Sequence, residues 1–204
     1  MKIKVIPVGM LAANCYILED EQTSLAAVID PGDEAERILS QLRADGVSVA
    51  LILLTHGHFD HILAAESIRR AFPDAAVYIH SGDAHGAGGR AVDLTLAIPD
   101  LRTYGEGDAL TLGSLTIDVL HAPGHSRGSV VLRSGGVLFT GDVLFAGTCG
   151  RTDLPGGSYP QMMASLKRLG ALDGDYQILP GHGEGSTLEA ERQFNPYLRM
   201  AVEE

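Results

Sequence analysis

Potential metal ligands are concentrated between residues 51 and 61, which read Leu-Ile-Leu-Leu-Thr-His-Gly-His-Phe-Asp-His. The four aliphatic residues at the start of this stretch predict a short buried strand. Burying imidazole and carboxylate groups together in a packed core is costly unless each is hydrogen-bonded. A divalent cation removes this cost, because imidazole nitrogen and carboxylate oxygen are its preferred ligands. The stretch therefore predicts a metal site made of His56, His58, Asp60 and His61.

The spacing of these groups indicates two adjacent metal positions. On an extended backbone, residues i and i+2 point the same way, so His56 and His58 can bind one ion. Asp60 and His61 stand at the start of a predicted helix that runs to about Ala71, turned toward a neighbouring point. The i, i+4 spacing of a helical His-Glu-x-x-His zinc motif does not occur in this stretch. A polar loop with surface histidines is the alternative, and the density of ligands argues against it.

Three later segments share one form, an apolar strand followed by a metal-binding side chain in a glycine-containing turn. These strands and the side chains that follow them are 115–120 with His125, 137–140 with Asp142, and 176–179 with His182. Strand ends gathered at one edge of a sheet are where open α/β sites form. We therefore expect these side chains to lie beside the first group.

Short strands and amphipathic helices must position these groups. The N-terminal strands are predicted at Lys2–Val8, Asn14–Glu19 and Leu25–Asp30. Side-chain caps are predicted at the starts of three helices. They are Asp33 before a helix through Leu42, Ser158 with Gln161 before a helix to Leu169, and Ser186 with Glu189 before the penultimate helix. Asp30 ends an apolar strand on the side of the metal loop, so we expect its carboxylate to orient a ligand histidine.

Composition narrows the class of protein. The 204 residues predict one domain, 1–204, with 45% hydrophobic and 20% charged residues. A formal net charge of −11 argues against nucleic-acid binding, which needs clustered Lys and Arg. The N-terminus reads as a strand and not as a signal peptide, and no apolar run approaches the length of a membrane span. Cys15 and Cys149 form no disulfide framework, which favours a reducing cytoplasm.

The motif Thr55–His61, followed in order by His125, Asp142 and His182, resembles the metallo-β-lactamase fold superfamily over essentially the whole chain. Within that superfamily, Asn14–Tyr16, the Pro-Gly-His turns and the run 144–153 resemble the glyoxalase II-like hydrolases. The fold that this resemblance implies is a four-layer αββα sandwich, two β-sheets packed face to face with helices outside.

The resemblance also implies two metal ions and their ligands. One ion is expected to be bound by His56, His58 and His125, and a second by Asp60, His61 and His182, with Asp142 bridging the two. Zinc is the first choice of metal, and iron and manganese accept the same ligands. Asp60 is also expected to accept a hydrogen bond from a hydroxide that bridges the two ions.

The expected reaction is hydrolysis of a small acyl thioester such as S-lactoylglutathione. Two cations lower the pKa of a bridging water toward about 7, and the resulting hydroxide attacks the carbonyl carbon. A thiol with a pKa near 8.5 then leaves as thiolate without a strong general acid. Cys149 and Arg151 are candidate substrate contacts. The simpler interpretations are a packed thiol and a structural Arg151–Asp153 pair.

Departures from the family patterns limit the expected substrates. β-Lactamases of this fold commonly carry Cys where this chain has Asp142, which argues against antibiotic hydrolysis. Flavodiiron relatives carry Glu at the position of His58. Glyoxalase II proper adds a C-terminal helical domain that holds glutathione, and no such domain is expected after residue 196.

Other reactions remain open within the same resemblance. A persulfide dioxygenase would hold one iron with His56, His125 and Asp142, and would leave the other ligands without a metal to bind. Metal-dependent esterases, lactonases and phosphoesterases are further alternatives. A metal-binding scaffold without activity is poorly supported, because no expected ligand is missing.

Overall fold

The computed structural model describes residues 1–87 and 92–203, and two six-stranded sheets form the centre of this described part. The first sheet has the order β1-β2-β3-β4-β5-β6. Its strands are β1 (Lys2–Val8), β2 (Ala13–Asp20), β3 (Leu25–Ile29), β4 (Ser48–Leu54), β5 (Ala76–His80) and β6 (Arg102–Tyr104). The second sheet has the order β14-β13-β10-β9-β8-β7. Its strands are β7 (Ala109–Leu112), β8 (Leu115–His121), β9 (Val130–Ser134), β10 (Val137–Gly141), β13 (Gln177–Pro180) and β14 (Ser186–Thr187).

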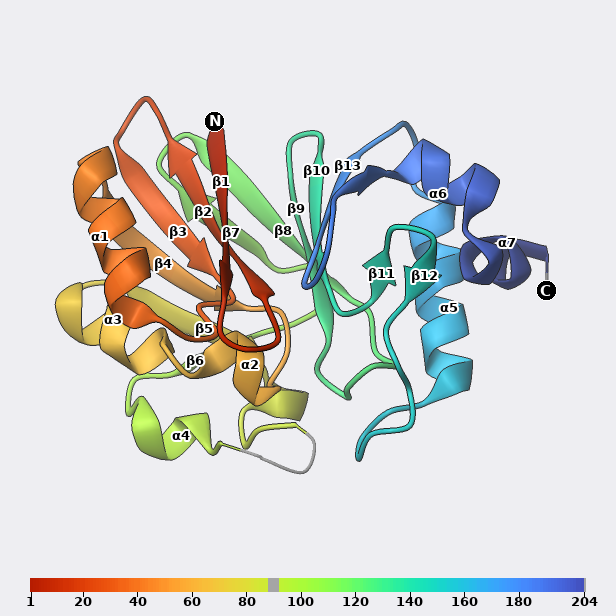
Figure 1. The fold of residues 1–204 in the computed structure, drawn as a ribbon, viewed down its shortest axis with the longest axis horizontal. Helices are drawn as coiled ribbons and strands as arrows, with labels where there is room; N and C mark the ends of the chain where they lie inside the picture. The colour runs from red at the N-terminus through yellow and green to blue at the C-terminus, as the bar shows by residue number, and fades with distance from the viewer. Residues whose placement is uncertain (88–91, 204) are drawn as a thin grey trace.

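Helices cover the outer faces of both sheets (Figure 1). Those beside the first sheet are α1 (Ala35–Asp45), α2 (Phe59–Ile62), α3 (Ala65–Ala71) and α4 (Leu94–Ala97), with a short 3₁₀ turn at Ser81–Asp83. Those beside the second sheet are α5 (Tyr159–Gly170), α6 (Leu188–Phe194) and α7 (Pro196–Glu203). A small hairpin, β11 (Leu144–Phe145) with β12 (Thr148–Cys149), lies between the second sheet and these helices. The arrangement confirms the predicted αββα sandwich.

Three apolar clusters lie between the four layers. Ile38 and Ile68 belong to the cluster between the first sheet and its helices. Phe139, from the second sheet, packs in the cluster between the sheets, and Met162 in the cluster beneath α5 and α7. β2 and β10 have an apolar cluster on each face of their sheet, which explains why nearly all of their side chains are buried.

Parallel pairing brings the predicted ligands to one edge of the sandwich. β3 pairs with β4, and β10 pairs with β13, in parallel. Their carboxyl ends therefore lie at the same edge, where α2 and the β1–β2 turn are also found (Figure 1).

The three predicted side-chain caps do not form, although Ser158 does stand at the N-cap position of its helix, because the capping side chains have other partners or none. The Asp33 Oδ1 accepts the next backbone N–H, that of Glu34, and Glu34 itself stands before α1 in a left-handed conformation. Ser158 precedes α5 but its side chain caps no backbone N–H. Ahead of α6, Thr187 caps the N–H of Ala190, while Ser186 donates to Glu191.

The single helix predicted through residue 71 is also wrong, because it divides into α2 and α3. The N–H of Ala64 donates to the carbonyl oxygen of Pro31, 2.9 Å away, which ends the first helical turn. Gly32 approaches this turn so closely that a Cβ there would lie 1.7 Å from the carbonyl oxygen of Asp60. The turn after β3 thus sets where α2 stops.

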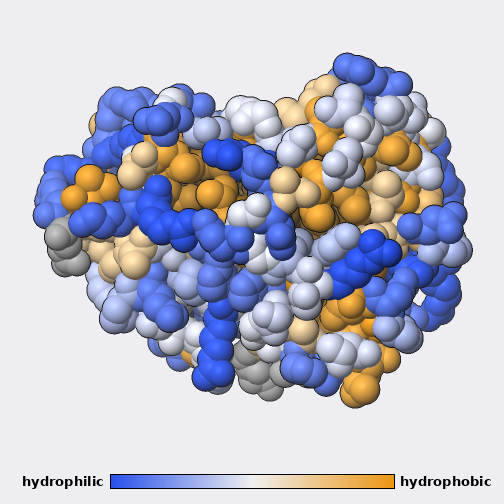
Figure 2. Space-filling model, turned by 180° about the vertical axis from the view of Figure 1, so that it is seen from behind, coloured by the Kyte–Doolittle hydropathy of each residue, from blue (hydrophilic) through white to orange (hydrophobic). Residues whose placement is uncertain are grey.

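The face opposite to that of Figure 1 carries a hydrophilic band between two groups of hydrophobic side chains (Figure 2). Scattered apolar surface of this kind is normal for a folded protein. Within residues 1–87 and 92–203, every helix is too short or too polar to cross a membrane.

Candidate metal centre

The structure gathers the predicted ligands into two triads. The ligand atoms of His56, His58 and His125 all lie within 4.8 Å of one another. Those of Asp60, His61 and His182 meet the same limit.

Asp142 lies between the two triads. Its Oδ2 is 3.4 Å from the Nε2 of His125 and 3.7 Å from the Nε2 of His182. Its Oδ1 is 3.5 Å from the Nε2 of His61. One carboxylate therefore faces both triads, which is the position the resemblance implied for a bridging ligand.

Outer hydrogen bonds fix the protons on His125 and His182. The Nδ1 of His125 donates to the carbonyl oxygen of Arg151 at 2.8 Å, and the Nδ1 of His182 donates to that of Leu11 at 3.1 Å. A carbonyl oxygen can only accept, so in each neutral ring the proton is on Nδ1. The Nε2 lone pairs are thus directed toward the cluster.

Asp30 plays the orienting role expected from the sequence. It accepts from the hydroxyl of Thr55 at 2.6 Å and from the Nδ1 of His61 at 3.0 Å. Because the Thr55 hydroxyl proton is used on Asp30, the Thr55 oxygen accepts from the Nδ1 of His56, 3.1 Å away. The buried carboxylate of Asp30 is thereby fully occupied, and the Nε2 lone pairs of both histidines remain for the cluster.

The cluster has the features of a site that fits metal cations. Among the described residues, the buried atoms Nε2 of His56 and Oδ1 of Asp142 have no hydrogen-bond partner, and the Nδ1 of His58 faces the Nε2 of His125 at 2.8 Å. The Nε2 atoms of His61 and His182 face each other at 3.2 Å. Unpaired buried acceptors are costly. A cation in each triad would satisfy these atoms together, so the donor set fits two divalent metals.

The two triads differ in their affinity for protons. Burial, with His61 and His125 nearby, lowers the pKa of His56 well below its ordinary value. Burial and His125 likewise lower the pKa of His58 to about 4. His56 and His58 are therefore neutral at neutral pH, and their ring nitrogens can bind metal without losing a proton.

The second triad holds positive charge when it is free of metal. Burial works to lower the pKa of His61, but Asp142 and Asp30 outweigh it and raise that pKa to about 9. Burial works to raise the pKa of Asp60, but the hydrogen bond from His182 and the charge of His61 lower it to about 2. The hydrogen bond to Asp60 raises the pKa of His182.

Asp83 holds two ligand loops together, and the sequence did not indicate this. Its buried carboxylate accepts from the N–H of Gly57 at 2.9 Å, the hydroxyl of Ser126 at 2.6 Å and the N–H of Gly128 at 2.8 Å. A Cβ on Gly57 would lie 2.7 Å from the Asp83 carbonyl oxygen, so this contact needs glycine. Asp83 thus joins the loop of His56 and His58 to the loop of His125.

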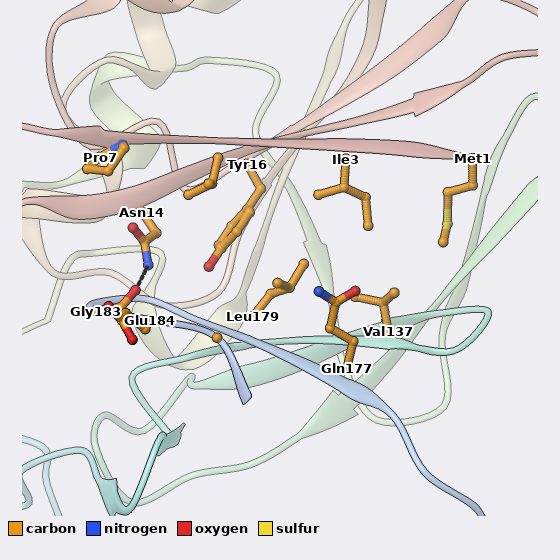
Figure 3. A pocket seen from close by; sticks show the side chains of 12 residues that line it. Met1, Ile3, Pro7, Asn14, Tyr16, Val137, Gln177, Leu179, Gly183 and Glu184 are labelled. Atoms are coloured by element: carbon orange, nitrogen blue, oxygen red, sulfur yellow. Dashed lines mark hydrogen bonds between the residues drawn. The ribbon is translucent and has the colours of Figure 1, made fainter. Parts of the chain in front are cut away.

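The loop of His182 is held by β2 (Figure 3). The side-chain amide of Asn14 donates to the carbonyl oxygens of Pro180 and Gly183 at 3.0 and 2.9 Å. The hydroxyl of Tyr16 also donates to Pro180, at 2.7 Å. These contacts give Asn14 and Tyr16, two residues of the Asn-Cys-Tyr motif, a structural role. Both residues also line a hollow of about 660 Å³ between β1 and β13.

The two candidate substrate contacts lie near the cluster in different ways. The Arg151 side chain is exposed and pairs with Asp153 at 2.7 Å, which is the simpler interpretation, while its carbonyl oxygen holds His125. Cys149 is half-buried in β12, and burial raises the pKa of its thiol. Substrate contact by either side chain stays a prediction.

A four-layer αββα sandwich with paired His and Asp triads at its strand ends defines the metallo-hydrolase class. The family model described as the metallo-beta-lactamase superfamily matches residues 8–182, and the chain belongs to this superfamily.

Two curated relatives match nearly the whole chain. The hydroxyacylglutathione hydrolase GloC of Haemophilus influenzae is 36% identical and covers 97% of this chain and 98% of its own length. The probable metallo-hydrolase YqgX of Bacillus subtilis is 35% identical, with the same two coverages of 97% and 98%.

Two solved structures are also similar over nearly their full lengths. The B3 metallo-beta-lactamase BLEG-1 has a TM-score of 0.86 at 34% identity, covering 97% of this chain and 99% of that one. TTHA1623, solved in a di-iron-bound form, has a TM-score of 0.79 at 37% identity, covering 95% and 99%.

Proposed function

We propose that this protein hydrolyses small acyl thioesters with a pair of divalent cations. The observation that carries the proposal is the pair of triads that share Asp142. The similarity to a hydroxyacylglutathione hydrolase over nearly the whole chain supports thioesters as the substrate class. Zinc as the metal, a cytoplasmic location and a small-molecule substrate, with no nucleic acid or membrane as partner, belong to the same proposal.

Within this proposal, one cation is held by His56, His58 and His125, and the other by Asp60, His61 and His182, with Asp142 shared. When bound, the pair would supply an activated water at neutral pH and a Lewis acid for the carbonyl oxygen.

The chain's own groups orient the reactants. With a pKa lowered to about 2, the Asp60 carboxylate stays ionised at neutral pH and can accept a hydrogen bond from the attacking water. The outer bonds of His125, His61 and His182 fix each ring with its Nε2 toward the cluster, so the ligand geometry is set before substrate binds. The leaving thiol has an ordinary pKa of about 8.5, so its departure needs no strong acid from the protein.

Hydrolysis of S-lactoylglutathione, followed by loss of thioester absorbance, tests the proposal together with metal analysis. We expect about two metal ions per chain and a loss of activity of at least 100-fold in Asp142→Ala, since ligand loss removes the shared carboxylate. Asp118→Ala is the matched control, because Asp118 pairs with Arg133 on the second sheet. A protein loaded with two metals that hydrolyses no acyl thioester would refute the proposal.

β-Lactam hydrolysis is a second candidate, favoured by the similarity to BLEG-1. The sequence prediction against this activity, based on Asp142 in place of Cys, stays a prediction. Parallel assays with a chromogenic cephalosporin decide between the two, and faster turnover of the cephalosporin would favour the second candidate.

The dioxygenase alternative uses only His56, His125 and Asp142, and it gives the Asp60, His61 and His182 triad no metal. The formation of that second triad in the structure supports the hydrolase instead. One iron per chain, with oxygen consumption on glutathione persulfide, would reverse this preference.

A further inference from the structure

An apolar hollow of about 260 Å³ opens directly beside Asp60. Its apolar walls come from the end of β1, the β1–β2 turn and the region of α2, and they consist of Val8, Met10, Leu11, Phe59 and Leu63. Two carboxylates also line it: Asp60, which belongs to the second triad, and Asp33. Pockets of this kind, apolar with a few polar groups at one end, are typical of small-molecule sites.

The side chains at the mouth of this hollow are unusually exposed for their type. Met10 is fully exposed, Leu11 is 56% exposed and Leu63 is 49% exposed. Large apolar side chains that gather at the surface beside a polar cluster mark a binding surface. Methionine suits such a wall, because its unbranched side chain adapts to different apolar ligands.

Hydrogen bonds hold the β1–β2 turn against the metal centre. The carbonyl oxygen of Leu11 accepts from the Nδ1 of His182 at 3.1 Å. Just beyond the turn, the N–H of Asn14 donates to the carbonyl oxygen of Gly181 at 2.7 Å. A group that lies against Met10 and Leu11 is therefore held at a defined distance from the second triad.

A second hollow, polar in its lining, lies beside the loop that carries His125. It is lined by Asp83, Ser126 and the exposed Arg127. The centre thus adjoins one apolar hollow, at Asp60, and one polar hollow, next to His125, which matches a molecule with one apolar and one polar end.

We infer that the hollow beside Asp60 binds the aliphatic acyl chain of the thioester, while the polar thiol carrier lies on the side of Arg127. The inference rests on the proposed function and deepens it, since it sets the substrate class as aliphatic acyl thioesters. A volume of 260 Å³ is below the range of pockets that hold drug-sized ligands, so the hollow suits a short chain and not the whole carrier.

Acetyl, butyryl and hexanoyl thioesters of glutathione test the inference through their kcat/KM values. Burial of each added methylene is expected to raise kcat/KM about fourfold until the hollow is filled. Leu63→Ser is expected to flatten this dependence, and the matched control Leu96→Ser, at an 81% exposed position on α4, is expected to keep it. Equal kcat/KM values across the series would overturn the inference and leave thioester hydrolysis standing.

A second measurement is independent of turnover. The methyl group of Met10, labelled with ¹³C, is followed by NMR while the thioethers S-methylglutathione or S-hexylglutathione are added. We expect the hexyl compound to shift this signal and the methyl compound to leave it in place. An unchanged Met10 signal at saturating hexyl thioether would overturn the inference, whether or not the protein hydrolyses thioesters.

Discussion

Replacing Asp83 by Asn tests whether a buried carboxylate outside the ligand set positions the first triad. The carboxylate accepts from Gly57, Ser126 and Gly128, at distances between 2.6 and 2.9 Å. Asn has nearly the same shape but offers only one acceptor oxygen, and its NH₂ group faces a donor. We expect both stability and metal binding to fall.

The size of the expected loss in stability follows from these hydrogen bonds. Each bond to a charged group contributes about 1.5–3 kcal/mol, and a buried donor without a partner costs about 1–3 kcal/mol. With one acceptor retained, Asp83→Asn should cost about 3 kcal/mol. For a chain of this size that lowers Tm by about 6–12 °C. Loss of a group that orients metal ligands typically weakens metal binding 10- to 100-fold.

Thermal unfolding in a chelator measures the first effect, and zinc titration of the metal-free protein measures the second. Asp118→Asn is the matched control, since the Asp118–Arg133 pair is partly exposed and should contribute about 1 kcal/mol or less. Unchanged Tm and zinc affinity in Asp83→Asn would refute the reasoning. A lower Tm with unchanged zinc affinity would show that Asp83 supports the fold and does not position the ligands.

Three further outcomes are expected. Because the pKa of His61 is about 9, a metal at its triad must displace a proton below that pH. Metal titrations should show affinity at this triad falling at least about tenfold per pH unit from pH 8 to 6, since His61 must release one proton on binding; an affinity that stays constant over this range would contradict this. Gly32→Ala should lower the free energy of unfolding by more than about 4 kcal/mol in denaturant titrations, because the new Cβ would lie 1.7 Å from the Asp60 carbonyl oxygen. The control Gly136→Ala, which faces open space, should change it by less than about 0.5 kcal/mol. Metal at 100 times its Kd should stabilise the folded protein by about 2.7 kcal/mol, so removing it with a chelator should lower Tm by about 5–10 °C. An unchanged Tm would argue against bound metal.

The predicted ligands could be found from sequence because each one follows an apolar strand. His125, Asp142 and His182 stand at such ends, and parallel pairing of β10 with β13 makes their convergence a consequence of topology. The density of histidines after β4 added a chemical signal that no packed core would produce. The layer order followed from the family resemblance and is confirmed by the structure.

Asp83 could not be found in this way, because its partners are distant in sequence. It follows β5 in a Ser-Gly-Asp turn, and Gly57 and Ser126 lie 26 and 43 residues away. Two of its three partners are backbone N–H groups, which carry no signature in residue type. The helix caps failed for a related reason, since Asp33 and Ser186 bind groups other than the helix N–H groups their positions predicted.

The β1–β2 hairpin contacts His182, the last predicted ligand in the sequence, at the metal centre. An isolated β-bridge joins Ala13 to His182, and the His182 side chain donates a hydrogen bond to the carbonyl oxygen of Leu11. Leu11 is synthesised 171 residues before His182, so the N-terminal hairpin reaches this partner only after the chain between them has been made. His56, His58 and His125 are all synthesised before His182. The first triad therefore needs the chain only as far as His125, whereas the second cannot form until His182 has been made.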